Sequence, residues 1–230
     1  MKAAVLDKIL AARSARQPIV RLSWLETEAE RLVAPGDAAL LEELPGDVRA
    51  AVDEAIRSDR ASMLEDAEGA LFVHPFNPPL RLAIIGAVHI AQRLATLAID
   101  LGYDVTLIDP RRGFLTEARF PGASRVHDWP DQALTSFALD ARTAVVTLSH
   151  DAKIDEPALE VALRSDCFYV GALGSRRTQE KRRDRLREAG LSDQELARIH
   201  GPVGLDLGAK SPAEIALSIA AELVATLRAR

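Results

Sequence analysis

The chain has 230 residues, a formal net charge of −5 and a single cysteine, Cys167. The negative charge disfavours a general nucleic-acid binder, which needs a basic face to release counterions, and one cysteine allows neither an intrachain disulfide nor a cysteine-based metal site. No apolar segment approaches the roughly 20 residues of a membrane span, and Asp7 and Lys8 interrupt the start of the chain before a signal sequence forms. We therefore expect a cytoplasmic protein without a nucleic-acid or membrane partner.

Residues 1–77 predict a small N-terminal α+β region. Helices are expected at 2–13 and 46–60, and strands at 20–25, 30–33 and 70–76, with the first two strands paired. Asn77, Pro78 and Pro79 follow. Two consecutive prolines fit neither a helix interior nor a central strand, so we place a domain boundary there.

From residue 80 to residue 230, short apolar segments alternate with helical patterns. Strands are expected at 81–85, 104–109, 143–149 and 167–173, with a weaker one at 124–128, and helices near 88–101, 131–139, 156–165, 177–189, 192–199 and 212–228. Continuously apolar strands such as AVVTL fit a sheet that is covered on both faces. Alternation of strands and helices implies parallel strands with right-handed crossovers. The sequence therefore predicts an α/β fold with a doubly wound, Rossmann-like parallel sheet.

Polar residues gather where four of the expected strands end. Open parallel sheets bind ligands outside the carboxyl ends of their strands, so these residues are binding candidates. They are Gly86, Ala87, Val88 and His89 at the first end, Asp109, Arg111 and Arg112 at the second, His150 and Asp151 at the third, and Gly174, Ser175, Arg176, Arg177 and Thr178 at the fourth. The strands themselves carry almost no such residues, which predicts a site along one edge of the sheet.

The first of these ends has the outline of a dinucleotide-binding turn. Gly86 can make the sharp turn, and Asp109 follows 23 residues later, close to the usual position of the acidic residue that holds a ribose hydroxyl. Val88, however, stands where a second glycine would let a pyrophosphate approach the backbone. The alternative is a strand packed on a helix without a ligand, with His89 as a cap or in solvent. Arg111 and Arg112 either take a phosphate near the ribose or face solvent.

The sequence GALGSRRT forms a second glycine-rich turn before a helix. Gly174 leaves the backbone open, Ser175 or Thr178 can cap the helix, and the helix dipole with Arg176 and Arg177 favours an anion. We expect this turn to be the main anion clamp, and we expect the two turns to flank one crevice. The alternative is an ordinary capped helix with exposed arginines.

Two further loops contain candidate residues. His150 and Asp151 lie in SHDAKID, which can orient a histidine for proton transfer, hold a metal or simply cap the next helix. Asp206 lies in a long glycine-containing loop, and such loops are often functional. The loop ends in a capping box at Ser211. We assign no catalytic residue and no metal ligand.

Over residues 80–224, a series of motifs in the same order resembles the XdhC/CoxI family. Members of this family are accessory proteins for the maturation of xanthine dehydrogenase and carbon monoxide dehydrogenase. The motifs are IIGAVHIAQ, VTLIDPR, FPGA, VVTLSHD, FYVGALGSRRT, KRRDRLREAGL and RIHGPVGLDLGAKSPAEIALSI. The family's usual first turn reads GAGH, whereas this chain has valine at position 88.

The resemblance implies a maturation factor without turnover of its own. It implies binding of the molybdenum cofactor, as molybdopterin or its dinucleotide form, and its protection during sulfuration by a cysteine desulfurase. It also implies delivery to an apo-molybdoenzyme of the xanthine dehydrogenase class, and we also consider a homodimer. The alternative is an NAD(P)-linked oxidoreductase that uses His150 as its acid or base.

Overall fold

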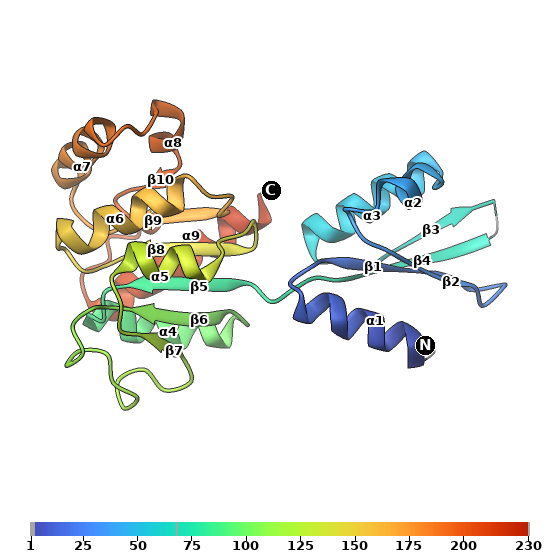
Figure 1. The fold of residues 1–230 in the computed structure, drawn as a ribbon, viewed down its shortest axis with the longest axis horizontal. Helices are drawn as coiled ribbons and strands as arrows, with labels where there is room; N and C mark the ends of the chain where they lie inside the picture. Colours follow the sequence, from blue (N-terminus) through green and yellow to red (C-terminus); the bar gives the residue numbers. More distant parts are fainter. Residues whose placement is uncertain (1–2, 68, 230) are drawn as a thin grey trace. The chain divides into compact units, whose positions relative to one another are not determined.

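The computed structural model describes residues 3–67 and 69–229. These residues divide into two compact units, one ending at Pro78 and the other comprising Pro79–Ala229. Each unit has a sheet and a hydrophobic core of its own (Figure 1). Within the described residues, no helix combines the length and the hydrophobicity that crossing a membrane requires.

The first unit is a four-stranded antiparallel sheet with the strand order β2-β1-β4-β3. Its elements are α1 (Ala3–Ser14), β1 (Ile19–Trp24), β2 (Glu30–Val33), α2 (Ala38–Glu42), α3 (Gly46–Ser58), β3 (Ser62–Asp66) and β4 (Gly69–Phe76). The predicted pairing of the first two strands is confirmed, with Val20 opposite Val33. Val48 and Val52 of α3 pack with strand residues in the core of this unit. We did not predict α2 or β3, which are short and depend on their neighbours for stability.

The second unit is a six-stranded, all-parallel sheet. Its elements are β5 (Arg81–Ile85), α4 (His89–Asp100), β6 (Asp104–Ile108), β7 (Ser124–Val126), α5 (Pro130–Phe137), β8 (Thr143–Thr147), α6 (Ala152–Leu163), β9 (Tyr169–Ala172), α7 (Arg176–Glu188), α8 (Asp193–Ala197), β10 (Ile199–His200) and α9 (Pro212–Arg228). The strand order is β10-β9-β8-β5-β6-β7. Read from the other edge, the third, second, first, fourth, fifth and sixth strands lie side by side, as in dinucleotide-binding sheets. The predicted fold class is confirmed.

Helices cover both faces of this sheet, because successive side chains of a strand point to opposite faces. Leu82 and Ile84 of β5 pack with α4 and α9. Ala83 and Ile85 pack on the opposite face with α5 and α6, and this second cluster includes Leu186 of α7. Figure 1 shows the same three layers. The buried strands place the carboxyl ends of β5, β6, β8 and β9 along one edge.

Two predicted helices differ from the structure. The helix expected near 156–165 is α6, which begins at Ala152 because the Asp151 side chain accepts a hydrogen bond from the Lys153 amide and caps it. Pro157 therefore lies inside the helix rather than near its start. The helix expected at 192–199 ends at Ala197, because residues 199–200 form β10, which pairs with β9. Pairing with a sheet overrides a local helical preference.

Candidate functional site

The loops after β5 and β8 meet at the point where the strand order reverses. Gly86 has a φ of +98°, and a Cβ added there would lie 2.8 Å from the backbone N and Cα of Ser149. A glycine is therefore required for the contact between these two loops, in addition to the sharp turn. In such sheets, ligands usually bind in the crevice at the point where the strand order reverses. In this chain, the close approach of Gly86 to the backbone of Ser149 narrows that crevice.

The carboxylate of Asp109 organises the turn after β5. It is fully buried and accepts hydrogen bonds from the Ala87 amide at 2.7 Å and the Arg111 amide at 2.9 Å. The Arg111 guanidinium donates two more, at 2.9 and 2.8 Å. Burial acts to raise the pKa of Asp109, but the hydrogen bonds from Arg111 and Ala87 outweigh it and hold that pKa below its usual value. Because four donors fill the positions that a carboxylate offers, a ribose hydroxyl would have to displace one of them.

A pocket of about 320 Å³, which we call the Phe114 pocket, lies beside this turn. It is lined by Ala87, Val88, His89, Arg111, Phe114 and Arg119. The structure thus brings together four of the residues predicted from the first two strand ends, whereas the exposed Arg112 is not among the lining residues. Phe114 and Arg119 were not predicted, because nothing in the loop between β6 and β7 indicates which of its side chains fold back on the turn.

The turn before α7 is a capped helix start. The Ser175 hydroxyl accepts a hydrogen bond from the Thr178 amide at 3.3 Å, as one of the sequence interpretations expected. Gly174 has a φ of +136°, and a Cβ there would lie 2.9 Å from the methyl carbon of Thr178. The Thr178 side chain therefore occupies the space where a Cβ of residue 174 would lie.

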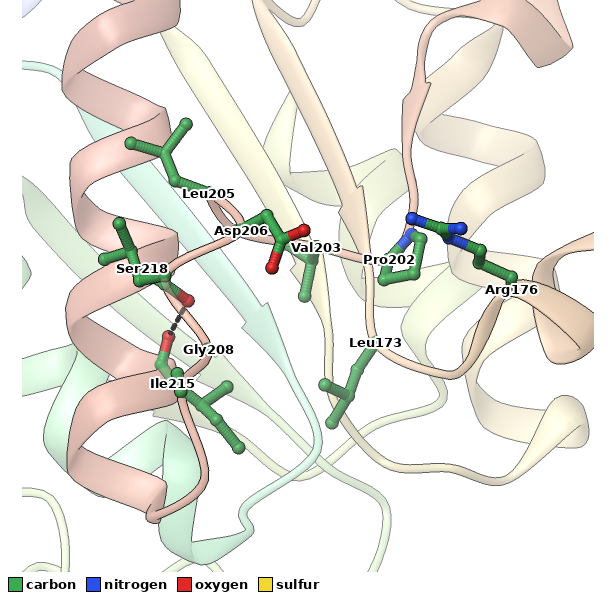
Figure 2. A pocket seen from close by; sticks show the side chains of 12 residues that line it. Leu173, Arg176, Pro202, Val203, Leu205, Asp206, Gly208, Ile215 and Ser218 are labelled. Carbon is green, nitrogen blue, oxygen red and sulfur yellow. Dashed lines mark hydrogen bonds between the residues drawn. The ribbon is translucent and has the colours of Figure 1, made fainter.

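A second pocket, the Arg176 pocket, has a volume of about 350 Å³ and connects the start of α7 with the loop before α9. Arg176 lies beside Pro202, whereas Leu205, Asp206 and Ser218 lie at the α9 end (Figure 2). Apolar side chains such as Leu173 complete the wall. Arg176 and Asp206 are thus brought to one cavity, and Arg177 is not among its lining residues.

Each of the two turns contributes residues to a different pocket, and the single crevice that both would flank stays a prediction. The strand order explains the two pockets: β8 lies between β5 and β9. Two strand spacings put the ends of β5 and β9 about 10 Å apart. Both pockets are on the side of the sheet covered by α4 and α9, since Val88 and Leu173 pack against that core.

His150 and Asp151, at the end of β8, are exposed and are not among the lining residues of either pocket. Asp155, by contrast, is fully buried and accepts hydrogen bonds from the Ser149 amide and hydroxyl, at 3.2 and 2.7 Å. Burial raises the pKa of Asp155, and Arg182 lies 3.7 Å from its second oxygen. Asp155 thus fixes the end of β8 rather than capping α6. The described residues contain no cluster of three or more His, Cys, Asp or Glu side chains suited to a metal ion.

A partly buried network that was not predicted from the sequence anchors the loop of the Arg176 pocket. Glu222 of α9 accepts hydrogen bonds from the Tyr169 hydroxyl and, at 2.8 Å, from the Gly204 amide, and its other oxygen lies 3.2 Å from His200 Nδ1. The ring of His200 stacks on Tyr169 with 4.4 Å between centroids. Burial opposes ionisation of Glu222, but bonds from His200, Tyr169 and Gly204 hold its pKa below the usual value. The sequence feature that could have indicated this network is Glu222, an acidic residue within the largely apolar helix 212–228.

Residues 82–223, which carry both pockets, match the model of the XdhC Rossmann domain. The chain belongs to the XdhC Rossmann domain family. This membership confirms the resemblance predicted from the ordered motifs.

Two curated relatives share this domain. The chain is 37% identical over 153 residues to the molybdenum cofactor insertion chaperone PaoD of Escherichia coli K12, covering 66% of this chain and 42% of PaoD. It is 30% identical over 157 residues to a protein of Bacillus subtilis 168 that is named as a probable xanthine dehydrogenase subunit, covering 68% of this chain and 46% of that protein. The chain thus spans less than half the length of either relative.

One solved structure resembles nearly the whole chain. It is a Bacillus halodurans protein titled a xanthine dehydrogenase, with a TM-score of 0.72, 22% identity, and coverage of 99% of this chain and 65% of that one. At this identity the likeness shows the fold alone.

Proposed function

We propose that this chain binds the molybdenum cofactor and delivers it to an apo-molybdoenzyme of the xanthine dehydrogenase class. The observation that carries the proposal is the 37% identity to a molybdenum cofactor insertion chaperone over the domain that holds both pockets. The pockets have the size of small-ligand sites.

The chemistry of the Arg176 pocket fits a phosphorylated heterocycle. The Arg176 guanidinium, at the start of α7, is suited to the phosphate because its planar fork can donate two parallel hydrogen bonds. The Asp206 carboxylate, on the other side of the pocket, can accept from the amino and ring N–H groups of a pterin. Leu173, Val203 and Ile215 provide apolar contacts for the ring. We therefore assign the phosphate to Arg176 and the pterin edge to Asp206.

Sulfuration of the bound cofactor would need sulfur from another protein. The one cysteine of this chain, Cys167, is 4% exposed, and burial raises the pKa of its thiol. A buried thiol with a raised pKa is a poor nucleophile, since the thiolate is the reactive form. This supports a cysteine desulfurase as a partner that brings the sulfur to the cofactor.

An NAD(P)-linked oxidoreductase is the second candidate, and the order of the parallel strands favours it. The state of Asp109 argues against it, because the carboxylate that would hold the ribose already accepts four hydrogen bonds. His150, its candidate acid or base, is exposed and lies outside the lining of both pockets.

The test is the pterin content of the protein purified from a host that makes the cofactor. After denaturation and oxidation, we expect pterin fluorescence from the parent and from Arg177→Ala, and a strong loss from Arg176→Ala. The loaded parent should also activate an apo-enzyme of the xanthine dehydrogenase class. Absence of pterin, together with NAD(P) reduction that His150→Ala abolishes, would establish the oxidoreductase instead.

A further inference from the structure

We propose that the Phe114 pocket is a separate site for a nucleoside monophosphate group, with the base against Phe114 and the phosphate at Arg119. The proposal concerns a different pocket from the one assigned to the pterin and does not depend on it. If the proposed function also holds, this second site gives the chain a preference for the nucleotide-bearing form of the cofactor.

The aromatic side chain of Phe114 contacts Arg111 but is not covered. Phe114 is 50% exposed, although the Arg111 guanidinium lies 4.9 Å from its ring centroid. Its backbone carbonyl accepts a hydrogen bond from Arg119 Nη1. An exposed aromatic ring offers a stacking surface to a base.

The charge of the pocket favours an anion. No carboxylate is among its lining residues. Asp109 behind it balances Arg111, whereas Arg119 forms no ion pair within the described part of the chain and contributes an unbalanced positive charge. Arg111 uses its Nε and one Nη2 hydrogen for Asp109, so three of its five N–H groups remain available. Both guanidinium groups are thus oriented before a ligand arrives.

The mode of binding differs from that of an ordinary dinucleotide turn. There, backbone amides after the first strand bind the pyrophosphate. Here the Ala87 amide donates to Asp109 at 2.7 Å, and the Val88 amide donates to the Gly86 carbonyl at 3.0 Å. Val88 also presents a side chain to the pocket. Because the Ala87 and Val88 amides are already occupied, we assign recognition to the side chains of Phe114 and Arg119.

The experiment is calorimetric titration of the full chain with GMP, guanosine and inorganic phosphate. Phe114→Leu keeps the apolar bulk but removes the aromatic face, and we expect it to weaken GMP and guanosine about tenfold while leaving phosphate unchanged. Arg119→Gln should weaken GMP and phosphate but not guanosine. Phe114→Tyr retains an aromatic ring and should bind GMP like the parent. Comparison with Phe114→Leu therefore separates loss of stacking from misfolding.

Two exposed residues outside the pocket provide matched controls: Trp129→Leu for the aromatic change and Arg112→Gln for the charge change. Both should bind GMP like the parent. The proposal is overturned if GMP shows no binding at millimolar concentration, or if either control loses as much affinity as its pocket counterpart. Pterin content is measured separately on the same proteins. GMP binding by a pterin-free protein would therefore contradict the proposed function while leaving this site intact.

Discussion

The carboxylate of Asp109 accepts a hydrogen bond from the backbone amide of Ala87 at 2.7 Å, so the end of β6 holds the turn that follows β5. The residue whose position resembles that of a ribose-binding acid is thus part of the scaffold of the first turn. Arg111, which forms an ion pair with the same carboxylate, becomes a fixed wall of the Phe114 pocket.

Asp109→Asn should destabilise the folded protein at pH 7. The amide keeps the shape of the side chain but loses charged hydrogen bonds, and we expect a decrease of about 2 kcal/mol in the free energy of unfolding. Urea denaturation of both proteins measures it. The exposed Asp206→Asn serves as the control and should lie within about 0.5 kcal/mol of the parent.

The effect of Asp109→Asn should also depend on pH, with a definite sign. The pKa of Asp109 is lowered in the folded protein, so as the pH falls the unfolded chain takes up this proton first. The stabilisation from the carboxylate is present above the unfolded pKa of about 3.9 and is lost as the pH falls towards the folded pKa. The difference between parent and variant should shrink below about pH 4; a difference that stays constant from pH 7 to pH 3 contradicts this role.

Gly86→Ala should destabilise the protein more than Gly102→Ala does. Both glycines have positive φ, +98° and +85°, so both substitutions carry a backbone penalty of about 1 kcal/mol. Only at Gly86 does the new Cβ meet the backbone of Ser149, whereas nothing lies within 4 Å at Gly102. We expect an additional loss of about 2 kcal/mol at Gly86, measured by thermal unfolding. Equal losses would show that the contact between the two loops is easily relaxed.

Tyr169→Phe should cost about 1–2 kcal/mol of stability, because it removes the hydroxyl that donates to the half-buried Glu222 carboxylate. Tyr103→Phe is the matched control. The buried Tyr103 hydroxyl has no hydrogen-bond partner among the described residues, so its removal should change stability by less than about 0.5 kcal/mol. Hydrogen exchange at the Gly204 amide, which donates to Glu222, should accelerate in Tyr169→Phe alone. Unchanged exchange would exclude Glu222 as the anchor of this loop.

Arg176→Ala should weaken binding of the phosphorylated pterin more than Arg177→Ala or His89→Ala. Arg176 lines the pocket assigned to the pterin, Arg177 is not among its lining residues, and His89 lines the Phe114 pocket. The loss should shrink as salt rises, because exposed charges are screened over about 8–10 Å at physiological ionic strength. Fluorescence titration of the three variants at low and moderate salt measures the order of their affinities. If His89→Ala alone loses binding of the phosphorylated pterin, the anion clamp is at the first turn.

Local patterns in the sequence were sufficient for the fold class and for most elements of the second unit. Apolar runs such as 143–147 form buried strands, and the capping box at Ser211 starts α9 as expected. These features depend on interactions within a few residues, so their signals are local. The same patterns placed the polar residues at one edge of the sheet, since parallel strands end on the same side.

Only the tertiary structure decided what those polar residues contact. The Tyr169 hydroxyl meets Glu222 53 residues away, and Asp109 meets the Ala87 amide 22 residues away. The separation of the two pockets follows from β8 lying between β5 and β9. Such contacts arise when strands and helices pack, and the energy that selects them is shared among many residues rather than carried by a local motif. The sequence by itself therefore determined which edge of the sheet is polar, and the packing determined which of its residues can meet a ligand.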